Sequence, residues 1–238
     1  MADCGPPPRD AESIGIRHVH DGDTLILEDE RRLRLLGFNT PEIERRERPA
    51  EPLGMQAREQ LVQWIENSGR RIRLQYDAEG KDRYGRTLAH AFLEDGRSIA
   101  ELMLEAGLAT TLIIPPNLQH ASCYAEAEQK ARAQKRGVWA LPSHQPVGLE
   151  ELRYHRDRYT VLRSRVLKLE QNVKGFIIWL GTYENAVRVY IAADDLELFP
   201  QKRLKTLAGH EVEIRGWLHR RDKVWTMQLR HPAQFDIQ

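Results

Sequence analysis

The sequence predicts a mainly β protein with some α-helix, built as two small barrels in tandem. Three observations support this class. Short apolar runs separated by turn signals fill residues 13–38 and again 160–230. In the first half, helical periodicity is confined to segments that follow or interrupt the strands. A stretch with Pro, Gly and Ser but no periodicity, "ALPSHQPVG", separates the two groups of strands.

The first group opens with three strand-like runs, "IGIRHVH", "TLILE" and "RRLRLLGF", separated by turn signals such as Asp21-Gly22. Pro41 cannot donate a hydrogen bond to a strand ladder, so the third strand is expected to end before it. Two more strands are expected in "RRIRLQYDAEG" and "RYGRTLAHAFLEDG". Five strands with helices inserted and appended are typical of a barrel of the oligonucleotide-binding (OB) type.

Three helices are expected in this first barrel. Apolar residues recur at helical spacing over residues 55–69. Ser98 and Glu101 form a capping-box pattern, so a second helix begins there and is expected to end at Gly107. The third helix is expected over residues 118–136.

The second group of strands has five strand-like runs with a helix-like insert after the third, which is again the order of an OB barrel. The sequence therefore predicts an N-terminal tail (1–11), a first domain (12–140), a linker (141–158) and a second domain (159–238). No stretch of about 18 apolar residues is present, so no membrane-spanning helix is expected.

Charge is distributed unevenly along the 238 residues, although the net charge is only +1. Residues 151–238 contain 16 Lys and Arg against 11 Asp and Glu, which leaves the first 150 residues acidic. An acidic half beside a basic half fits a carboxylate-rich site joined to a surface for a polyanion. Two ordinary domains of different composition would give the same asymmetry.

The two cysteines, Cys4 and Cys123, are far apart and lack metal-binding spacing. They are either two free buried thiols or a candidate disulfide that ties the N-terminal tail to the first domain. A disulfide requires an oxidising compartment. The start "MADC" has no charged or apolar signal region and fits an exported protein whose signal peptide has been removed. We therefore expect a periplasmic or secreted protein, with a cytoplasmic location as the alternative.

Three clusters of residues in the first domain could take part in chemistry: "DGDT", "RLLGFNTPE" and "DRYGR". Each alone is also explained as a turn or a solvated face. In this order, and followed by "GLA", "PPN" and a helix ending in "GVW", they resemble the staphylococcal nuclease (thermonuclease) family across residues 12–140. The resemblance implies an enzyme that uses Ca²⁺ and water to hydrolyse the phosphodiester bonds of DNA or RNA.

The resemblance also assigns roles to individual residues. Those implied for the metal are Asp23 as a carboxylate ligand, Asn39 at the position of a second ligand, Thr40 through its backbone carbonyl, and Asp21 as an indirect supporting group. Those implied for the reaction are Glu42, which orients or deprotonates the attacking water, Arg34 and Arg86, which bind the scissile phosphate, and Tyr84, which contacts a substrate phosphate. Arg83, beside Tyr84, is a further candidate for substrate contact. These residue types suit the chemistry, because negative charge that develops on phosphate oxygens is stabilised by forked guanidinium groups and a divalent ion.

Two departures from the family pattern stand out. Asn39 replaces a carboxylate, so the site has one charge fewer, and an ion other than Ca²⁺ becomes possible. The segment "TTLIIPPN" is aliphatic where the best-known family member has tyrosines, so base contacts are left to Ile113 and Ile114 or to the second domain.

The second domain interleaves aromatic and basic residues in its strands, a pattern suited to binding single strands. Its candidate nucleic-acid contacts are Trp217, Arg220, Arg221 and Lys223. Strand alternation predicts that at least half of the domain's five strand aromatics, Phe176, Trp179, Tyr190, Trp217 and Trp225, face the core. Docking or stabilisation is the alternative role for this domain.

Taken together, the sequence predicts a monomeric, metal-dependent nuclease that acts mainly on single-stranded DNA or RNA. The alternative is a nuclease-like protein that binds nucleic acid or a partner with weak catalysis or none.

Overall fold

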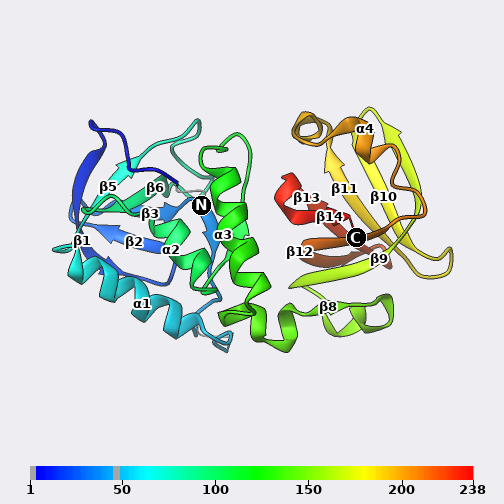
Figure 1. Ribbon diagram of the computed structural model, residues 1–238, viewed down its shortest axis with the longest axis horizontal. Helices are drawn as coiled ribbons and strands as arrows, with labels where there is room; N and C mark the ends of the chain where they lie inside the picture. Colours follow the sequence, from blue (N-terminus) through cyan, green and yellow to red (C-terminus); the bar gives the residue numbers. More distant parts are fainter. Residues whose placement is uncertain (1–3, 45–48, 238) are drawn as a thin grey trace. The chain divides into compact units, whose positions relative to one another are not determined.

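The computed structural model describes residues 4–44 and 49–237. The chain divides into two compact units, Met1–Ala140 and Leu141–Gln238 (Figure 1). Each unit contains a closed five-stranded barrel, as the sequence predicts. No helix in the described part of the chain is both long and apolar enough to cross a membrane.

The first barrel closes in the order β1-β2-β3-β6-β5, and β1 pairs back onto β5. Its strands are β1 (Glu12–Val19), β2 (Thr24–Leu27), β3 (Arg32–Leu35), β5 (Arg71–Gln75) and β6 (Thr87–Leu93). All neighbouring strands are antiparallel except β3 and β6, which run parallel. This is the strand order of an OB barrel.

The run "RRLRLLGF" does not form one strand. It divides into β3 and β4 (Gly37–Asn39), and β4 leaves the barrel to pair with β7 (Thr110–Leu112). The break lies at Gly37, whose φ of 95° belongs to the left-handed region that favours glycine. The ring of Tyr124 also lies where a Cβ at this position would be, so the bend needs glycine for space as well.

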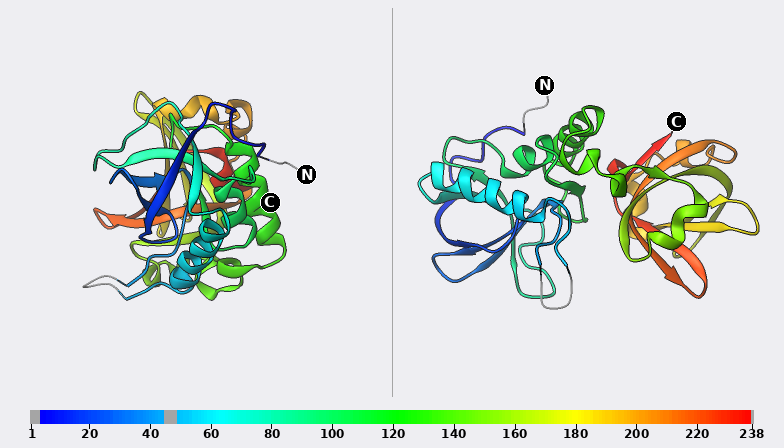
Figure 2. Two further views of the ribbon diagram at one scale, coloured as in Figure 1. Left: turned by 90° about the vertical axis from the view of Figure 1, so that its left-hand side faces the viewer. Right: turned by 90° about the horizontal axis from the view of Figure 1, so that it is seen from below.

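The helices of the first unit are α1 (Gly54–Asn67), α2 (Ile99–Glu105) and α3 (Ala121–Ala133). The expected capping box is present, because the Ser98 side chain accepts a hydrogen bond from the Glu101 N–H at 3.3 Å. α3 is shorter than expected: it starts after His120, whose left-handed backbone (φ 60°) cannot extend a helix. A 3₁₀ turn, η1 (Gly137–Ala140), ends the unit. Figure 2 shows α1 lying along the barrel, where it packs against β1 and α2.

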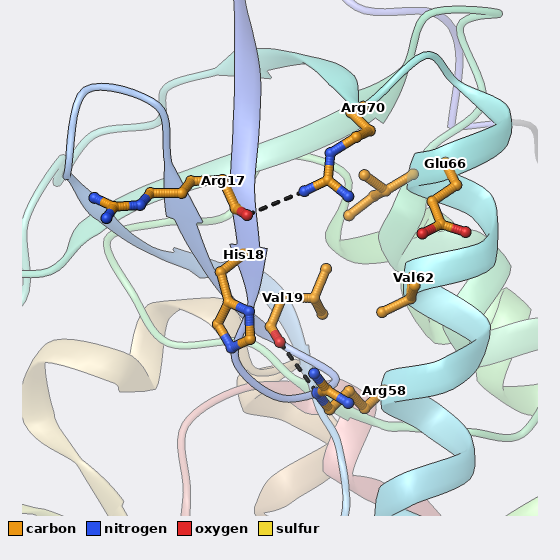
Figure 3. Close-up of a pocket in the computed structure, with 8 residues that line it drawn as sticks. Arg17, His18, Val19, Arg58, Val62, Glu66 and Arg70 are labelled. Carbon is orange, nitrogen blue, oxygen red and sulfur yellow. Dashed lines mark hydrogen bonds between the residues drawn. The ribbon is translucent and has the colours of Figure 1, made fainter.

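Two arginines join α1 and its C-terminal turn to the first strand. β1 changes partner from β5 to β2 near Ile16, with a register shift between Ile16 and His18. Arg70 donates to the carbonyl of Ile16 at 2.9 Å. It also donates to that of Arg17 at 3.0 Å, and Arg58 donates to that of Val19 at 3.1 Å (Figure 3). These guanidinium groups line a small cavity of about 190 Å³ between α1 and β1. They fix the strand end that leads directly into "DGDT".

Cys4 and Cys123 form a disulfide, with their Cα atoms 5.4 Å apart. The bond ties the N-terminal segment to α3, and both cysteines belong to the apolar core of the first unit.

The second barrel closes in the order β9-β10-β11-β13-β12, because β12 pairs with both β13 and β9. Its strands are β9 (Arg158–Asn172), β10 (Gly175–Gly181), β11 (Ala186–Ala192), β12 (Glu211–Arg221) and β13 (Val224–Leu229). The expected helical insert after the third strand consists of η4 (Ala193–Leu198) and α4 (Gln201–Leu204). β14 (Phe235–Ile237) follows η5 (Pro232–Gln234) and extends the sheet beside β12.

Residues 141–158, expected as a linker, have structure of their own within the second unit. They form η2 (Pro142–His144), β8 (Pro146–Val147) and η3 (Leu149–Tyr154), and β8 pairs in parallel with β9. Val147 and Leu152 belong to the apolar core of this unit.

Removal of the disulfide by a Cys4→Ala/Cys123→Ala double substitution should destabilise the protein. The bond closes a loop of 119 residues, and loss of a constraint on so long a loop costs roughly 4–5 kcal/mol of unfolding free energy in the chain-entropy model. Urea unfolding of the full chain should show a lower midpoint for the variant. Reductant should lower the midpoint of the unmodified protein and leave that of the variant unchanged. A midpoint insensitive to reductant, or an intact mass showing two free thiols, would contradict the expectation.

Candidate active site

The turn between β1 and β2 carries two buried aspartates. The Asp23 N–H donates to Asp21 Oδ1 at 3.1 Å, which fixes the turn from within. Gly22 is required by packing, because a Cβ at this position would lie 2.6 Å from the Thr40 side chain. Burial, followed by the nearby charge of Asp23, raises the pKa of Asp21. Two carboxylates held close together out of water form a site that favours a cation.

Asp23 connects this turn to the "NTPE" segment. Its Oδ2 accepts hydrogen bonds from the backbone N–H and the hydroxyl of Thr40 at 3.1 and 3.2 Å. The same oxygen lies 3.3 Å from an Arg34 guanidinium nitrogen. The other oxygen, Oδ1, accepts from the Thr24 hydroxyl at 3.1 Å. The buried Asp23 carboxylate is therefore compensated by one cation and by three polar hydrogens.

Arg34 is held from several sides. β3 pairs Arg34 with Thr24 of β2, which brings its side chain close to Asp23. The guanidinium group donates to the backbone carbonyls of Leu35 and of Phe38, the latter at 2.9 Å. It also donates to Asn39 Oδ1 at 3.1 Å. Only 11% of the Arg34 side chain is exposed, so its orientation is fixed before any substrate arrives.

Asn39 makes a hydrogen bond with each side of its amide. Its oxygen accepts from Arg34, and its nitrogen donates to the Thr40 carbonyl at 3.0 Å. The backbone oxygen that the family resemblance gives to the metal therefore accepts a hydrogen bond from the residue in place of the second carboxylate. A 180° rotation of the amide would exchange its two ends, so that the side-chain oxygen would take the place of the nitrogen beside the Thr40 carbonyl oxygen.

Glu42 lies in the loop that leads to α1. Its N–H donates to Glu51 Oε2 at 2.9 Å, and the Glu51 N–H donates to the Glu42 carbonyl at 2.8 Å. Gly54, the first residue of α1, packs against this loop so closely that a Cβ there would lie 2.6 Å from the Glu42 carbonyl oxygen. These contacts fix the backbone of Glu42 while its side chain lines the pocket described below.

Arg86 is positioned by Asp82. Asp82 Oδ2 accepts from Arg86 Nε at 2.8 Å, and Asp82 Oδ1 accepts from the backbone N–H groups of Tyr84 and Arg86, each at 2.9 Å. These bonds, and the Arg86 guanidinium above all, lower the pKa of Asp82 against the opposing effect of burial. The parallel pairing of β3 with β6 places Leu88, two residues after Arg86, beside Arg34. The topology thus brings the two arginines to one pocket.

This pocket has a volume of about 360 Å³. Six of the residues chosen from sequence line it: Asp21, Asp23, Arg34, Asn39, Glu42 and Arg86. Thr40 is buried behind the lining, 3% exposed, and joins the site through its bonds to Asp23 and Asn39. Ile114 lines the pocket, whereas Ile113 is buried in the core.

Tyr84 and Arg83 lie outside the lining. Tyr84 is 68% exposed, and the guanidinium carbon of Arg83 lies 4.8 Å from its ring centre. The Arg86 guanidinium carbon lies 5.7 Å from the same ring. Tyr84 therefore stands at the edge of the pocket beside Arg86.

Sequence reasoning assigned no role to four polar residues of the pocket, Thr24, Glu79, Asp82 and Asn117. Asn117, the last residue of "PPN", accepts from the Glu79 N–H at 2.7 Å and donates to the Glu79 carbonyl at 3.0 Å. It thereby fastens the segment before "DRYGR" to the loop after β7. Asp82 was visible in that motif, but its ion pair with Arg86 depends on a turn that the motif alone does not define.

The pocket's donor set fits a divalent metal ion. Two buried carboxylates, a backbone carbonyl, an amide oxygen and the nearby Glu42 are all hard oxygen donors, which Ca²⁺ and Mg²⁺ prefer. Among the described residues, Cys4, Glu101 and Cys123 form another group of potential ligands, but the two cysteines are joined in the disulfide.

In the second unit, the four residues chosen from sequence lie on β12 and the hairpin after it. Trp217 is 38% exposed, and Arg220, Arg221 and Lys223 are exposed. The guanidinium carbon of Arg220 lies 5.2 Å from the ring centre of Trp225. The expectation that at least half of the five strand aromatics face the core was wrong, because only Phe176 and Trp225 are buried.

A pocket beside an OB barrel that gathers two forked cations and several carboxylates is suited to phosphodiester hydrolysis. Comparison with known proteins agrees. Residues 32–141 match the family model for staphylococcal nuclease homologues. The chain is similar to the thermonuclease of Staphylococcus intermedius, with 36% identity over 54% of this chain and 76% of that protein. It is also similar to the thermonuclease of Staphylococcus hyicus, with 33% identity over 54% of this chain and 76% of that protein. Endonuclease YncB of Bacillus subtilis is 30% identical over 54% of this chain and 62% of that protein.

The chain belongs to the staphylococcal nuclease family, and it is a thermonuclease-like phosphodiester hydrolase. Enzymes of this family generally depend on a divalent metal ion. All but the last residue of the family match lies in the first unit.

Asp82→Asn should lower kcat roughly tenfold, because the guanidinium of Arg86 loses its charged partner and its fixed direction. Steady-state cleavage of a labelled oligonucleotide measures this. Asp95→Asn is a matched control, since Asp95 holds Arg97 in a similar pair at 2.7 Å, more than half exposed and remote from the pocket lining. Equal kcat values for the two variants would show that Asp82 does not position Arg86 for catalysis.

Proposed function

We propose that the first barrel is a Ca²⁺-dependent endonuclease that hydrolyses DNA or RNA and prefers single strands. The observation that carries this proposal is the convergence of Arg34, Arg86, Glu42 and the Asp21–Asp23 pair on one pocket. Attack on a phosphodiester places negative charge on the phosphate oxygens, and the pocket offers two guanidinium groups whose directions are already set.

Asp21, Asp23, Asn39 and the Thr40 carbonyl are the groups that would hold the metal ion. When bound, the ion supplies Lewis-acid stabilisation of the phosphate and a polarised water. Burial and, after it, the charge of Asp23 raise the pKa of Asp21, and a cation bound here would offset both effects.

Glu42 is proposed to orient the attacking water and accept its proton. Arg34 and Arg86 are proposed to bind non-bridging phosphate oxygens through forked hydrogen bonds, for which arginine is better suited than lysine. The partners of these arginines support the roles: Arg34 is held mainly by carbonyls and Asp23, and Arg86 by Asp82, so neither needs to reorganise as charge develops. Tyr84, beside Arg86 at the pocket edge, and its neighbour Arg83 are proposed to contact the next phosphate.

We further propose that the protein works in the periplasm or outside the cell. The disulfide supports this, because such bonds persist in oxidising compartments.

Cleavage of labelled single-stranded DNA with Ca²⁺, Mg²⁺, Mn²⁺ or chelator tests the proposed function. Ca²⁺ should support cleavage and chelator should abolish it. Glu42→Gln and Arg86→Ala should each lower kcat roughly 10²–10³-fold, the usual effect of removing one such group. Glu59→Gln and Arg97→Ala, in exposed positions outside the pocket, are the matched controls. Cleavage by the two pocket variants at the rate of the controls would refute the assigned roles. Binding without cleavage under every metal would favour the non-catalytic alternative.

Asn39→Asp should lower the Ca²⁺ concentration needed for half-maximal activity, by roughly tenfold, because an added charge at a ligand position strengthens binding of a hard cation. Calorimetric titration with Ca²⁺ alone gives an independent readout. Asn39→Ala, which removes the amide without adding charge, is the control and should not bind Ca²⁺ more tightly. Unchanged Ca²⁺ affinity in Asn39→Asp would show that residue 39 is not a ligand.

A further inference from the structure

The outer face of the second barrel carries a row of polar and aromatic side chains across four neighbouring strands. Backbone pairing aligns Lys168 of β9 with Trp179 of β10, Trp179 with Arg188 of β11, and Arg188 with Thr226 of β13. The next row on the same side includes Tyr190 of β11, paired with Ile177 of β10. We call the surface formed by Lys168, Trp179, Arg188, Tyr190 and Thr226 the β10–β11 face.

Strand alternation shows that this face points away from the core. Trp179 lies between Ile178 and Leu180, and Arg188 lies between Val187 and Val189; all four of these neighbours are fully buried. Trp179, Arg188 and Tyr190 are partly buried, each by its neighbours on the sheet. The face is therefore a surface whose side chains are packed side by side.

In the described part of the chain, three members of this surface, Trp179, Arg188 and Thr226, each have a buried side-chain nitrogen or oxygen without a hydrogen-bond partner, and Arg188 is the charged one. Within the described residues, it makes no hydrogen bond or ion pair, and its Nε is buried without a partner. Two other arginines of this barrel have carboxylate partners. Arg163 binds Glu213 at 2.8 Å, and Arg230 binds Asp195 at 2.6 Å. A partly buried guanidinium without a carboxylate costs free energy, and an anion bound at the face would offset that cost.

The neighbours of Arg188 indicate what kind of anion fits. Trp179 and Tyr190 are two aromatic rings on adjacent strands, one row apart, which is the arrangement of a stacking platform for unpaired bases. The Lys168 ammonium lies 5.4 Å from the centre of the Trp179 ring. Lys168 is already paired with Glu170 at 2.6 Å, so Arg188 is the cation left for a phosphate.

We propose that the β10–β11 face binds single-stranded nucleic acid, with bases stacked on Trp179 and Tyr190 and a backbone phosphate at Arg188. The inference rests on the proposed function of the first barrel, because it gives that enzyme a second, non-catalytic contact with its substrate. The stacking residues of this face lie on β10 and β11, whereas Trp217, Arg220 and Arg221 lie on β12 and Lys223 lies in the hairpin after it. A duplex is disfavoured, since its bases are not free to stack on side chains.

Fluorescence anisotropy of a labelled oligodeoxythymidylate of roughly 16 nucleotides tests the inference, using the full chain in chelator to prevent cleavage. Arg188→Gln should weaken binding about fivefold or more and reduce the dependence of log K on log salt by about 0.7, the contribution of one phosphate in a single strand. Trp179→Ala should weaken binding about tenfold, and Trp179→Phe, which retains a ring, should bind more tightly than Trp179→Ala.

Arg165→Gln is the charge-matched control. Arg165 is exposed and lies on β9 opposite Glu211 of β12 in the backbone register. The β9–β12 seam lies across the barrel from β11. This variant should bind the oligonucleotide like the unmodified protein. Equal affinities for Arg188→Gln, Trp179→Ala and Arg165→Gln would overturn the inference.

Two further measurements separate the possible failures. Metal-dependent cleavage of a nitrophenyl ester of thymidine phosphate, which is too small to span both barrels, should be unchanged by Arg188→Gln. If no variant or unmodified protein cleaves any substrate, the proposed function fails, and the binding result still decides the inference. Ultraviolet crosslinking of the oligonucleotide to the unmodified protein needs no variant to fold: adducts should fall within residues 175–192. Adducts confined to the first unit would overturn the inference.

Discussion

The buried carboxylate of Asp23 is the group on which the active site depends. It binds the backbone and hydroxyl of Thr40 and faces the guanidinium of Arg34. One side chain thus joins the β1–β2 turn, strand β3 and the loop that carries Glu42. Because an unpaired buried carboxylate is costly, these partners stay in place, and the site is assembled before a ligand binds.

The barrel closure supplies what Asp23 alone cannot. Arg86 is distant in sequence, and it reaches the pocket because β6 pairs in parallel with β3. Asp82 then fixes the direction of its guanidinium through a turn that uses three hydrogen bonds to one carboxylate. Topology brings the second arginine close, and local hydrogen bonding aims it. Arg58 and Arg70 act similarly on β1, since they satisfy carbonyls where the strand changes partner.

Features set by local chemistry could be predicted from the sequence. The hairpin turns, the Ser98 capping box and the order of strands in both barrels follow from short patterns. The break at Gly37 could not be predicted, because it depends on β7 and on the ring of Tyr124, both distant in sequence. The same is true of Asn117, whose pairing with Glu79 exists only in the folded chain. The outward aromatics of the second barrel were misjudged because apolar residues such as Ile177 share the outer face of its strands, so the sequence does not show which side of each strand is the core side.

Asn39 shows how the fold reconciles a missing charge with an ordered site. Asp21 and Asp23 already crowd two carboxylates into a buried turn, as the raised pKa of Asp21 reflects. A third carboxylate at position 39 would add a further negative charge to this cluster, with Arg34 as its neighbouring cation. The amide instead accepts from Arg34 and donates to the Thr40 carbonyl, so it links the arginine to the loop without any ion. With asparagine at position 39, the pocket attracts a cation less strongly than it would with a carboxylate there. In return, the pocket is ordered without a bound ion.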